Sequence, residues 1–365
     1  MEGFITSIEV ATRSIIVLSK GIPLLRAFFL FHLILEECNE ISIKQRFRTS
    51  MKKVNGDLLT PISIFQRLQG ERKFLLESSM KYEGHGRYSF IGVSPRKTYR
   101  GEQEQLIDTS HLTNKHYTYE GELISLLKQV MPRISSHTEY PFTGGGIGYI
   151  NALTNYLPEL EFHVYDTLII FDHLTDEIAV FDTNIEPEEV SANIDAFIEE
   201  LFANPTPQET TYALHTPELQ QDGVYGATFS GDAFALYRKL RIEHAAPYMY
   251  YIEFDDCTVV GTSENNYLQV RDGTLSATDQ APSIERFCQG TSQTVNTIQH
   301  GNLNPTLHAI DVVKALKPAQ GLIGYIGFNG QVDFTTPENI ITITGNRAHI
   351  RTNQAGVHFE ALMKG

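Results

Sequence analysis

Hydrophobic residues form two kinds of pattern along this chain, a helical spacing and continuous runs. Between Glu122 and Met131 they follow the i, i+3, i+4, i+7 spacing of one helix face, and Pro132 predicts the end of that helix. The runs 167–171 and 178–181 are continuously apolar and are joined by a short polar turn, which predicts a β-hairpin.

The C-terminal half has the same two patterns. Asp232 predicts the N-cap of a helix, and a further helix is expected around 310–316. Apolar and aromatic runs at 248–254 and 258–261, separated by two aspartates, predict another strand pair. Because strands and helices alternate without regular βαβ spacing, the pattern favours an α+β fold over a doubly wound sheet.

Two stretches break the pattern and suggest boundaries. Residues 204–223 carry three prolines and little periodicity, which predicts a linker. Residues 1–50 contain a long apolar run, but Lys20, Arg26 and His32 interrupt it, and such residues are costly in lipid. This segment is therefore expected to be an atypical extension that does not span a membrane.

Composition restricts the partners and the compartment. The formal net charge of −15 argues against a nucleic-acid surface, which is normally basic. The three cysteines, Cys38, Cys257 and Cys288, are far apart and form no CxxC pair, so neither a disulfide framework nor a zinc knuckle is expected. The cytoplasm is the compartment that fits this usage.

Residues 141–149 form a glycine-dense run, PFTGGGIGY. The run lacks the Lys-Ser/Thr of a P-loop and the helix of a dinucleotide fingerprint. Close backbone packing or a turn is the expected role.

Two β-type runs end in polar residues that could contact a ligand. In the run LLES, Glu77 and Ser78 follow an apolar pair, and a buried carboxylate there would need a partner such as an amine. The other interpretation is an ordinary strand whose polar end reaches water. Pro247, Tyr248 and Met249 begin an aromatic run that is also typical of a core strand.

LLES, the following GRYSFIG, the glycine-dense run and the PYM triplet together resemble anthranilate synthase component I, a chorismate-utilising family. The resemblance implies a two-sheet sandwich of mixed strands decorated with helices. It also implies that Glu77, Ser78, Pro247, Tyr248 and Met249 form a pocket for tryptophan as feedback inhibitor. An indole would pack on the apolar side chains, and its amino group would meet a carboxylate such as Glu77.

The same resemblance implies a lyase activity in tryptophan biosynthesis. Such a large subunit converts chorismate and ammonia, supplied from glutamine by an amidotransferase subunit (component II), to anthranilate and pyruvate with Mg²⁺. Near the C-terminus, Glu360 and Lys364 are spaced i, i+4, which on residues alone is a surface ion pair. By resemblance both are catalytic, Glu360 is also the metal ligand, and Gly356 lies in the substrate site.

The resemblance has gaps. It divides the chain into 1–50, a component I-like region 51–203, the linker 204–223 and a shortened chorismate-binding-like region 224–365. The family's acid-rich metal helix, His-x-x-His run and carboxylate-gripping arginine have no counterpart, so turnover is expected to be slow or absent. The alternatives are a non-catalytic tryptophan-binding remnant and aminodeoxychorismate synthase component I; Glu77 and Met249 favour the tryptophan pathway over the latter.

Overall fold

The computed structural model describes residues 49–78, 86–134, 138–151, 157–186, 193–203, 205, 210–220, 224–264 and 266–352. The chain divides into two compact units, residues 1–48 with 184–188 and residues 49–183 with 189–365. Every helix and strand below belongs to the second unit. The predicted apolar extension lies almost wholly outside the described residues, and no described helix has the length and apolar character needed to cross a bilayer.

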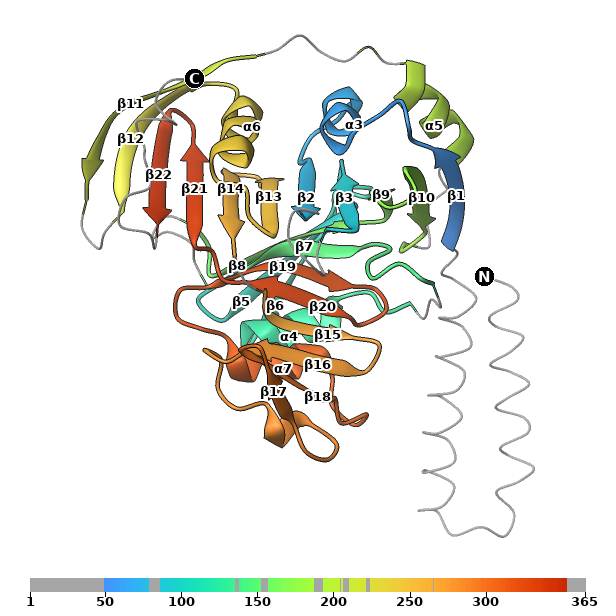
Figure 1. Ribbon diagram of the computed structural model, residues 1–365, viewed down its shortest axis with the longest axis vertical. Coiled ribbons are helices and arrows are strands. Elements are labelled where there is room, and N and C mark those ends of the chain that lie inside the picture. Colours follow the sequence, from blue (N-terminus) through green and yellow to red (C-terminus); the bar gives the residue numbers. More distant parts are fainter. Residues whose placement is uncertain are drawn as a thin grey trace. The chain divides into compact units, whose positions relative to one another are not determined.

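The first sheet has eleven strands and is antiparallel throughout its described pairings (Figure 1). In spatial order the strands are β1 (Thr49–Asn55), β10 (Glu177–Thr183), β9 (Thr167–Asp172), β3 (Tyr88–Gly92), β2 (Phe74–Ser78), β13 (Tyr248–Glu253), β14 (Thr258–Ser263), β21 (Asn339–Thr344), β22 (Arg347–Thr352), β12 (Tyr225–Gly231) and β11 (Tyr212–Leu219).

The second sheet also has eleven described strands. In spatial order they are β17 (Gln293–Val295), β18 (Ile298–Asn302), β16 (Thr274–Thr278), β15 (Asn266–Arg271), β20 (Val332–Thr335), β19 (Leu322–Gly327), β7 (Gly145–Ile150), β8 (Leu160–Tyr165), β4 (Lys97–Glu102), β5 (Gln105–Ser110) and β6 (His116–Glu120).

Helices cover the outer face of each sheet, so that the layers run helix, sheet, sheet, helix (Figure 1). Helices α3 (Pro61–Arg67) and α6 (Ala233–Glu243) pack on the first sheet, and α4 (Leu123–Val130) and α7 (Ala309–Leu316) pack together beside the second. Helix α5 (Ile194–Ala203) contacts β10, and a short 3₁₀ helix, η2, spans Glu285–Phe287. The expected two-sheet α+β sandwich is confirmed.

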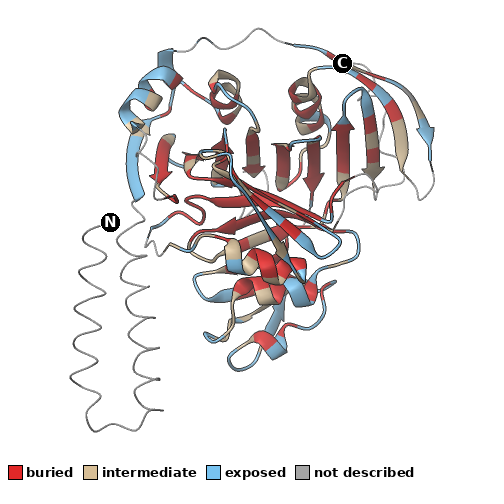
Figure 2. Cartoon of the chain, turned by 180° about the vertical axis from the view of Figure 1, so that it is seen from behind, coloured by how far each residue is buried: buried red, intermediate tan, exposed pale blue. Residues whose placement is uncertain are grey.

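Apolar side chains fill two layers of the core. In Figure 2 the central strands of the sheets are coloured mostly as buried. The layer between the sheets joins residues such as Phe74, Ile170 and Tyr250 of the first sheet to Tyr149 and Ile323 of the second. A second layer joins the first sheet to α3 and α6. Strands buried on both faces explain why 167–171 reads as a continuous apolar run without alternation.

Local sequence signals account for the helix bounds. The predicted helix 122–131 is α4, and its N-cap Glu122 accepts hydrogen bonds from the backbone N–H groups of Ile124 and Ser125. Asp232 caps α6 in the same way. The His308 ring caps α7, while the Asp311 carboxylate accepts from the His308 N–H. These caps satisfy donors that the first helical turn leaves free.

The glycine-dense run forms β7, and its glycines permit close packing, as predicted. A Cβ on Gly148 would lie 2.0 Å from the carbonyl oxygen of Glu161, and one on Gly145 would lie 2.2 Å from that of Ile326. The strand therefore approaches its neighbours more closely than any side chain allows.

Strand β11 lies inside 204–223, the stretch predicted to be a linker. The prolines that suggested a linker are compatible with this strand, because β11 is the last strand of its sheet and Pro217 lies near a register shift between His215 and Glu218. An edge strand tolerates a missing N–H at a bulge. Both sheets contain strands that precede this stretch in the sequence and strands that follow it. The four chain divisions stay predictions.

Candidate functional site

Strands β2 and β13 place the two predicted inhibitor-site motifs side by side. In their antiparallel register, Ser78 is opposite Tyr248 and Glu77 is opposite Met249. Pro247 directly precedes β13 and is buried. The motifs are far apart in sequence, and their juxtaposition depends on this single strand pairing.

The two cross-strand pairs occupy opposite faces of the sheet, because successive side chains alternate. Met249 belongs to the core layer under α3 and α6. Glu77 is on that same face, where Arg241 Nε donates to its Oε2 at 2.8 Å and the Tyr237 hydroxyl donates to the same oxygen. Its carboxylate thus contacts protein groups here, and its predicted role as partner of a ligand amine stays a prediction.

Ser78 and Tyr248, and also Glu77 and Met249, contribute atoms to the lining of a cavity of about 650 Å³ between the two sheets. Its walls include the aromatic side chains of Tyr88 and Phe90 from β3 and Tyr325 from β19. Known ligand sites have volumes of about 300–1,000 Å³, and most combine apolar walls with a few polar groups. This cavity therefore has the size and lining of a small-molecule site.

Polar side chains of β15 and β20 form one edge of the cavity. Asn266 Nδ2 and Gln269 Nε2 donate to the two carboxylate oxygens of Asp333, each at 2.6 Å. An Arg271 guanidinium nitrogen lies 3.8 Å from Asp333 Oδ2. This arrangement offers a carboxylate for an ammonium group and a guanidinium for a carboxylate.

The tyrosine hydroxyl groups of Tyr248 and Tyr325 in the cavity lining stay protonated. Burial, and then the charge of Asp333, raise the pKa of both Tyr248 and Tyr325. Farther along the lining, Ser276 Oγ and His300 Nδ1 are 2.9 Å apart as a cross-strand pair of β16 and β18. The cavity can therefore donate neutral hydrogen bonds beside its aromatic walls.

The remaining predicted site residues, Gly356, Glu360 and Lys364, lie outside the described residues. Within the described part, one group of side chains, Glu161, His163 and Asp255, has metal-ligand spacing. Neither Asp333 nor this group is indicated by a local sequence pattern, because Asp333 has its partners on β15 and Asp255 comes from a turn distant in sequence from β8. The alternation of Gln269 and Arg271 along β15 is the one local signal that could have indicated a polar strand face.

The family described as chorismate binding enzyme matches residues 224–278. Anthranilate synthase component 1 of Lactococcus lactis is 26% identical over 285 residues, covering 65% of this chain and 61% of that protein. The Bacillus subtilis protein of the same name is 26% identical over 281 residues, covering 60% of this chain and 55% of that protein. The chain thus spans less than two thirds of the length of these curated relatives.

Two solved structures share the fold. Anthranilate synthase component I from Streptococcus pneumoniae TIGR4 aligns with a TM-score of 0.58 at 19% identity, covering 81% of this chain and 92% of that chain. MenF, the menaquinone-specific isochorismate synthase of Escherichia coli, aligns with a TM-score of 0.50 at 12% identity, covering 83% and 87%. The resemblance to anthranilate synthase component I is confirmed.

Proposed function

We propose that this chain is a chorismate-binding protein of tryptophan biosynthesis, organised like the large subunit of anthranilate synthase, and that its cavity between the sheets binds tryptophan. One observation carries the proposal. Ser78 and Tyr248, from two motifs chosen for their resemblance to an inhibitor site, are cross-strand neighbours and both line the cavity.

The chemistry of the cavity suits an aromatic amino acid. Tyr88, Phe90 and Tyr325 offer rings on which an indole can pack edge to face or offset. Asp333 offers its carboxylate to an ammonium group, and Arg271 offers its guanidinium to a carboxylate. A zwitterion with an aromatic side chain satisfies all three features.

The reaction itself is the broader part of the proposal. The chain would bind chorismate and, with ammonia from a glutamine amidotransferase subunit, form anthranilate and pyruvate in the cytoplasm. Mg²⁺ held by Glu360 would stabilise the charge that develops on chorismate. Since the family's acid-rich helix and His-x-x-His run have no counterpart in the sequence, we expect turnover to be slow and tryptophan binding to be the better-preserved property.

Tryptophan binding can be measured directly on this chain. The protein contains no tryptophan, so indole emission reports the ligand alone. We expect saturable changes in the emission of added tryptophan, and heat in a calorimetric titration, at submillimolar to millimolar ligand. Folded protein that gives neither signal would overturn the proposed site.

Matched variants locate the binding site. Tyr248→Phe removes one hydroxyl from the cavity and is expected to weaken tryptophan binding roughly threefold to tenfold. Tyr117→Phe removes the same group from an exposed tyrosine on edge strand β6 and serves as the control. Equal affinities of the two variants would contradict binding in the cavity.

Turnover is tested separately, with chorismate, ammonium and Mg²⁺ and the fluorescence of anthranilate as the readout. We expect a rate at least about a thousandfold below that of an intact relative, because losing one positioned general base typically costs about 10²–10⁴ in rate. An ordinary rate that depends on Mg²⁺ and vanishes in Glu360→Ala would show that other carboxylates complete the site.

A further inference from the structure

A carboxylate and an imidazole are fully buried between the two sheets, away from the cavity. Glu161 and His163 are two residues apart on β8 and therefore share the face that meets the other sheet. Both side chains are 0% exposed, and His163 Nε2 lies 3.1 Å from Glu161 Oε1. Burying an ionised carboxylate is costly unless positive charge or several donors compensate it.

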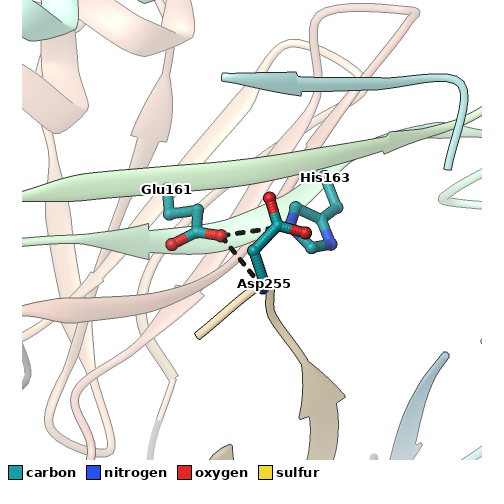
Figure 3. Close-up of side chains that lie close together, drawn as sticks. All are labelled: Glu161, His163 and Asp255. Carbon is teal, nitrogen blue, oxygen red and sulfur yellow. Dashed lines mark hydrogen bonds and ion pairs between the residues drawn. The ribbon is translucent and has the colours of Figure 1, made fainter. Parts of the chain in front are cut away.

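A second carboxylate reaches this pair from the opposite sheet. Asp255 lies in the turn between β13 and β14, and Figure 3 shows its side chain beside Glu161 and His163. One potential ligand atom from each of the three residues lies within 4.8 Å of the others. The Asp255 side chain is 31% exposed, so an ion can reach the cluster from solvent.

Protein groups pair Glu161 and His163 only in part. The Tyr149 hydroxyl is 3.4 Å from Glu161 Oε2, and the Asp255 N–H is 3.5 Å from Oε1, both at the limit of a hydrogen bond. His163 Nδ1 is buried and has no hydrogen-bond partner among the described residues. The ring therefore contacts the cluster through Nε2, and Nε2 is the nitrogen placed to bind a metal ion.

We propose that Glu161, His163 and Asp255 bind one divalent transition-metal ion of the zinc class. Zinc takes imidazole nitrogen at about 2.0–2.1 Å and carboxylate oxygen at about 2.0–2.2 Å, which places ligand atoms roughly 3–4 Å apart. The Nε2 to Oε1 distance of 3.1 Å fits that separation, and the ligand atoms of all three residues lie within 4.8 Å of one another. Magnesium is disfavoured because it prefers oxygen ligands in octahedral geometry.

The site is independent of the proposed function. None of its three residues lines the cavity. Because β8 belongs to one sheet and the β13–β14 turn to the other, the ion would join the two sheets at this position. An ion that binds only the native state raises its stability by mass action.

Substitution of Arg72 tests the proposal through a change that is expected to strengthen metal binding. Its guanidinium pairs with Asp255 and so competes with a cation for that carboxylate. Removing this positive charge in Arg72→Gln should strengthen metal binding, whereas losing a ligand should weaken it.

The experiment uses the full chain, stripped of metal with a chelator and titrated with Zn²⁺ by calorimetry. Co²⁺ absorption reports the ligand geometry in parallel. We expect one site whose affinity falls at least about tenfold in Glu161→Gln and in His163→Gln, with a matching loss of the metal-induced rise in melting temperature. Asp255→Asn removes the third ligand at a surface position, where the substitution leaves the core intact, and should weaken Zn²⁺ binding in the same way.

Asp256→Asn is the matched control, because Asp256 is in the same turn but pairs with Arg100 outside the cluster. It should bind Zn²⁺ like the wild type. The proposal is overturned if folded wild-type protein shows no saturable Zn²⁺ binding, if the three ligand variants bind as well as Asp256→Asn, or if millimolar Mg²⁺ displaces the ion.

Discussion

Arg241 on helix α6 and Glu77 on strand β2 form an ion pair, with Arg241 Nε 2.8 Å from Glu77 Oε2. The Glu77 side chain is 3% exposed, whereas that of Arg241 is 40% exposed. The glutamate of the LLES motif therefore ties the strand to the helix above it. It holds β2 in the position that presents Ser78 to the cavity.

Arg241→Met leaves the Glu77 carboxylate buried, with the Tyr237 hydroxyl still donating to it. We expect the free energy of unfolding to fall by about 2 kcal/mol, since a buried charge loses a partner. Denaturant titration measures this change. Lys239→Met, which breaks a half-exposed i, i+4 pair with Glu243 on the same helix, should change stability by less than about 0.5 kcal/mol. Similar falls in the free energy of unfolding in both variants would show that the Glu77–Arg241 pair stabilises the fold no more than the Lys239–Glu243 pair does.

Asp333→Asn replaces the carboxylate that faces the cavity with a neutral amide. If Asp333 receives the ammonium group of tryptophan, affinity should drop by about tenfold or more, the loss of a charge-assisted hydrogen bond. Indole emission of the ligand measures this. Asp279→Asn, an exposed aspartate at the end of β16, controls for the change in net charge. Unchanged affinity in Asp333→Asn would place the amine elsewhere in the cavity.

His308 makes the stability of the chain depend on pH. Burial, and then the charges of Arg133 and Lys128, lower the pKa of His308 from 6.5 to about 4. Between these values the unfolded chain binds more protons than the folded chain, so this contribution is complete above about pH 6.5 and is lost as pH falls toward 4. His308→Asn keeps a side-chain acceptor at the N-cap without the titration.

The measurement is the free energy of unfolding of both proteins between pH 7 and pH 4. The wild type should lose stability more steeply than His308→Asn over this range, because the variant lacks one titrating group. Parallel curves would contradict a depressed pKa at this position.

Gly148→Ala places a methyl group against the backbone of β8. The added Cβ would lie 2.0 Å from the Glu161 carbonyl oxygen, and overpacking of this kind costs about 1–3 kcal/mol or more. Gly273→Ala is the control, with a φ of +77° but no atom near the added Cβ, so it should cost only about 1 kcal/mol of backbone strain. Thermal melting measures both variants. A smaller fall in melting temperature for Gly148→Ala than for Gly273→Ala would mean that the strands can separate without loss of stability.

Local features were predictable from the sequence, and pairings distant in sequence were not. The helix α4 and the β9–β10 hairpin follow from apolar spacing and a short turn, both of which are local. Strand β11 is not predicted, because its stretch contains prolines and little periodicity. An edge strand has only one hydrogen-bonded neighbour and so a weaker compositional signal.

The candidate site divides in the same way. Ser78 and Tyr248 were identified because each lies in a recognisable motif. Asp333 was not identified, because it becomes a candidate only through its hydrogen bonds with Asn266 and Gln269 on a neighbouring strand. The face on which Glu77 lies depends on strand register, and a shift of one residue would reverse it.

The strand order also determines when this protein can fold during its synthesis. Strand β2, near the middle of its sheet, pairs on one side with β13, and β7 pairs with β19, although each partner is made much later. While the first half leaves the ribosome, these apolar strands have an open edge that only the second half can fill. Such long-range pairing folds slowly and leaves nascent chains prone to aggregation. We therefore expect the yield of native protein to depend on chaperones that hold the N-terminal half until residue 327 has emerged.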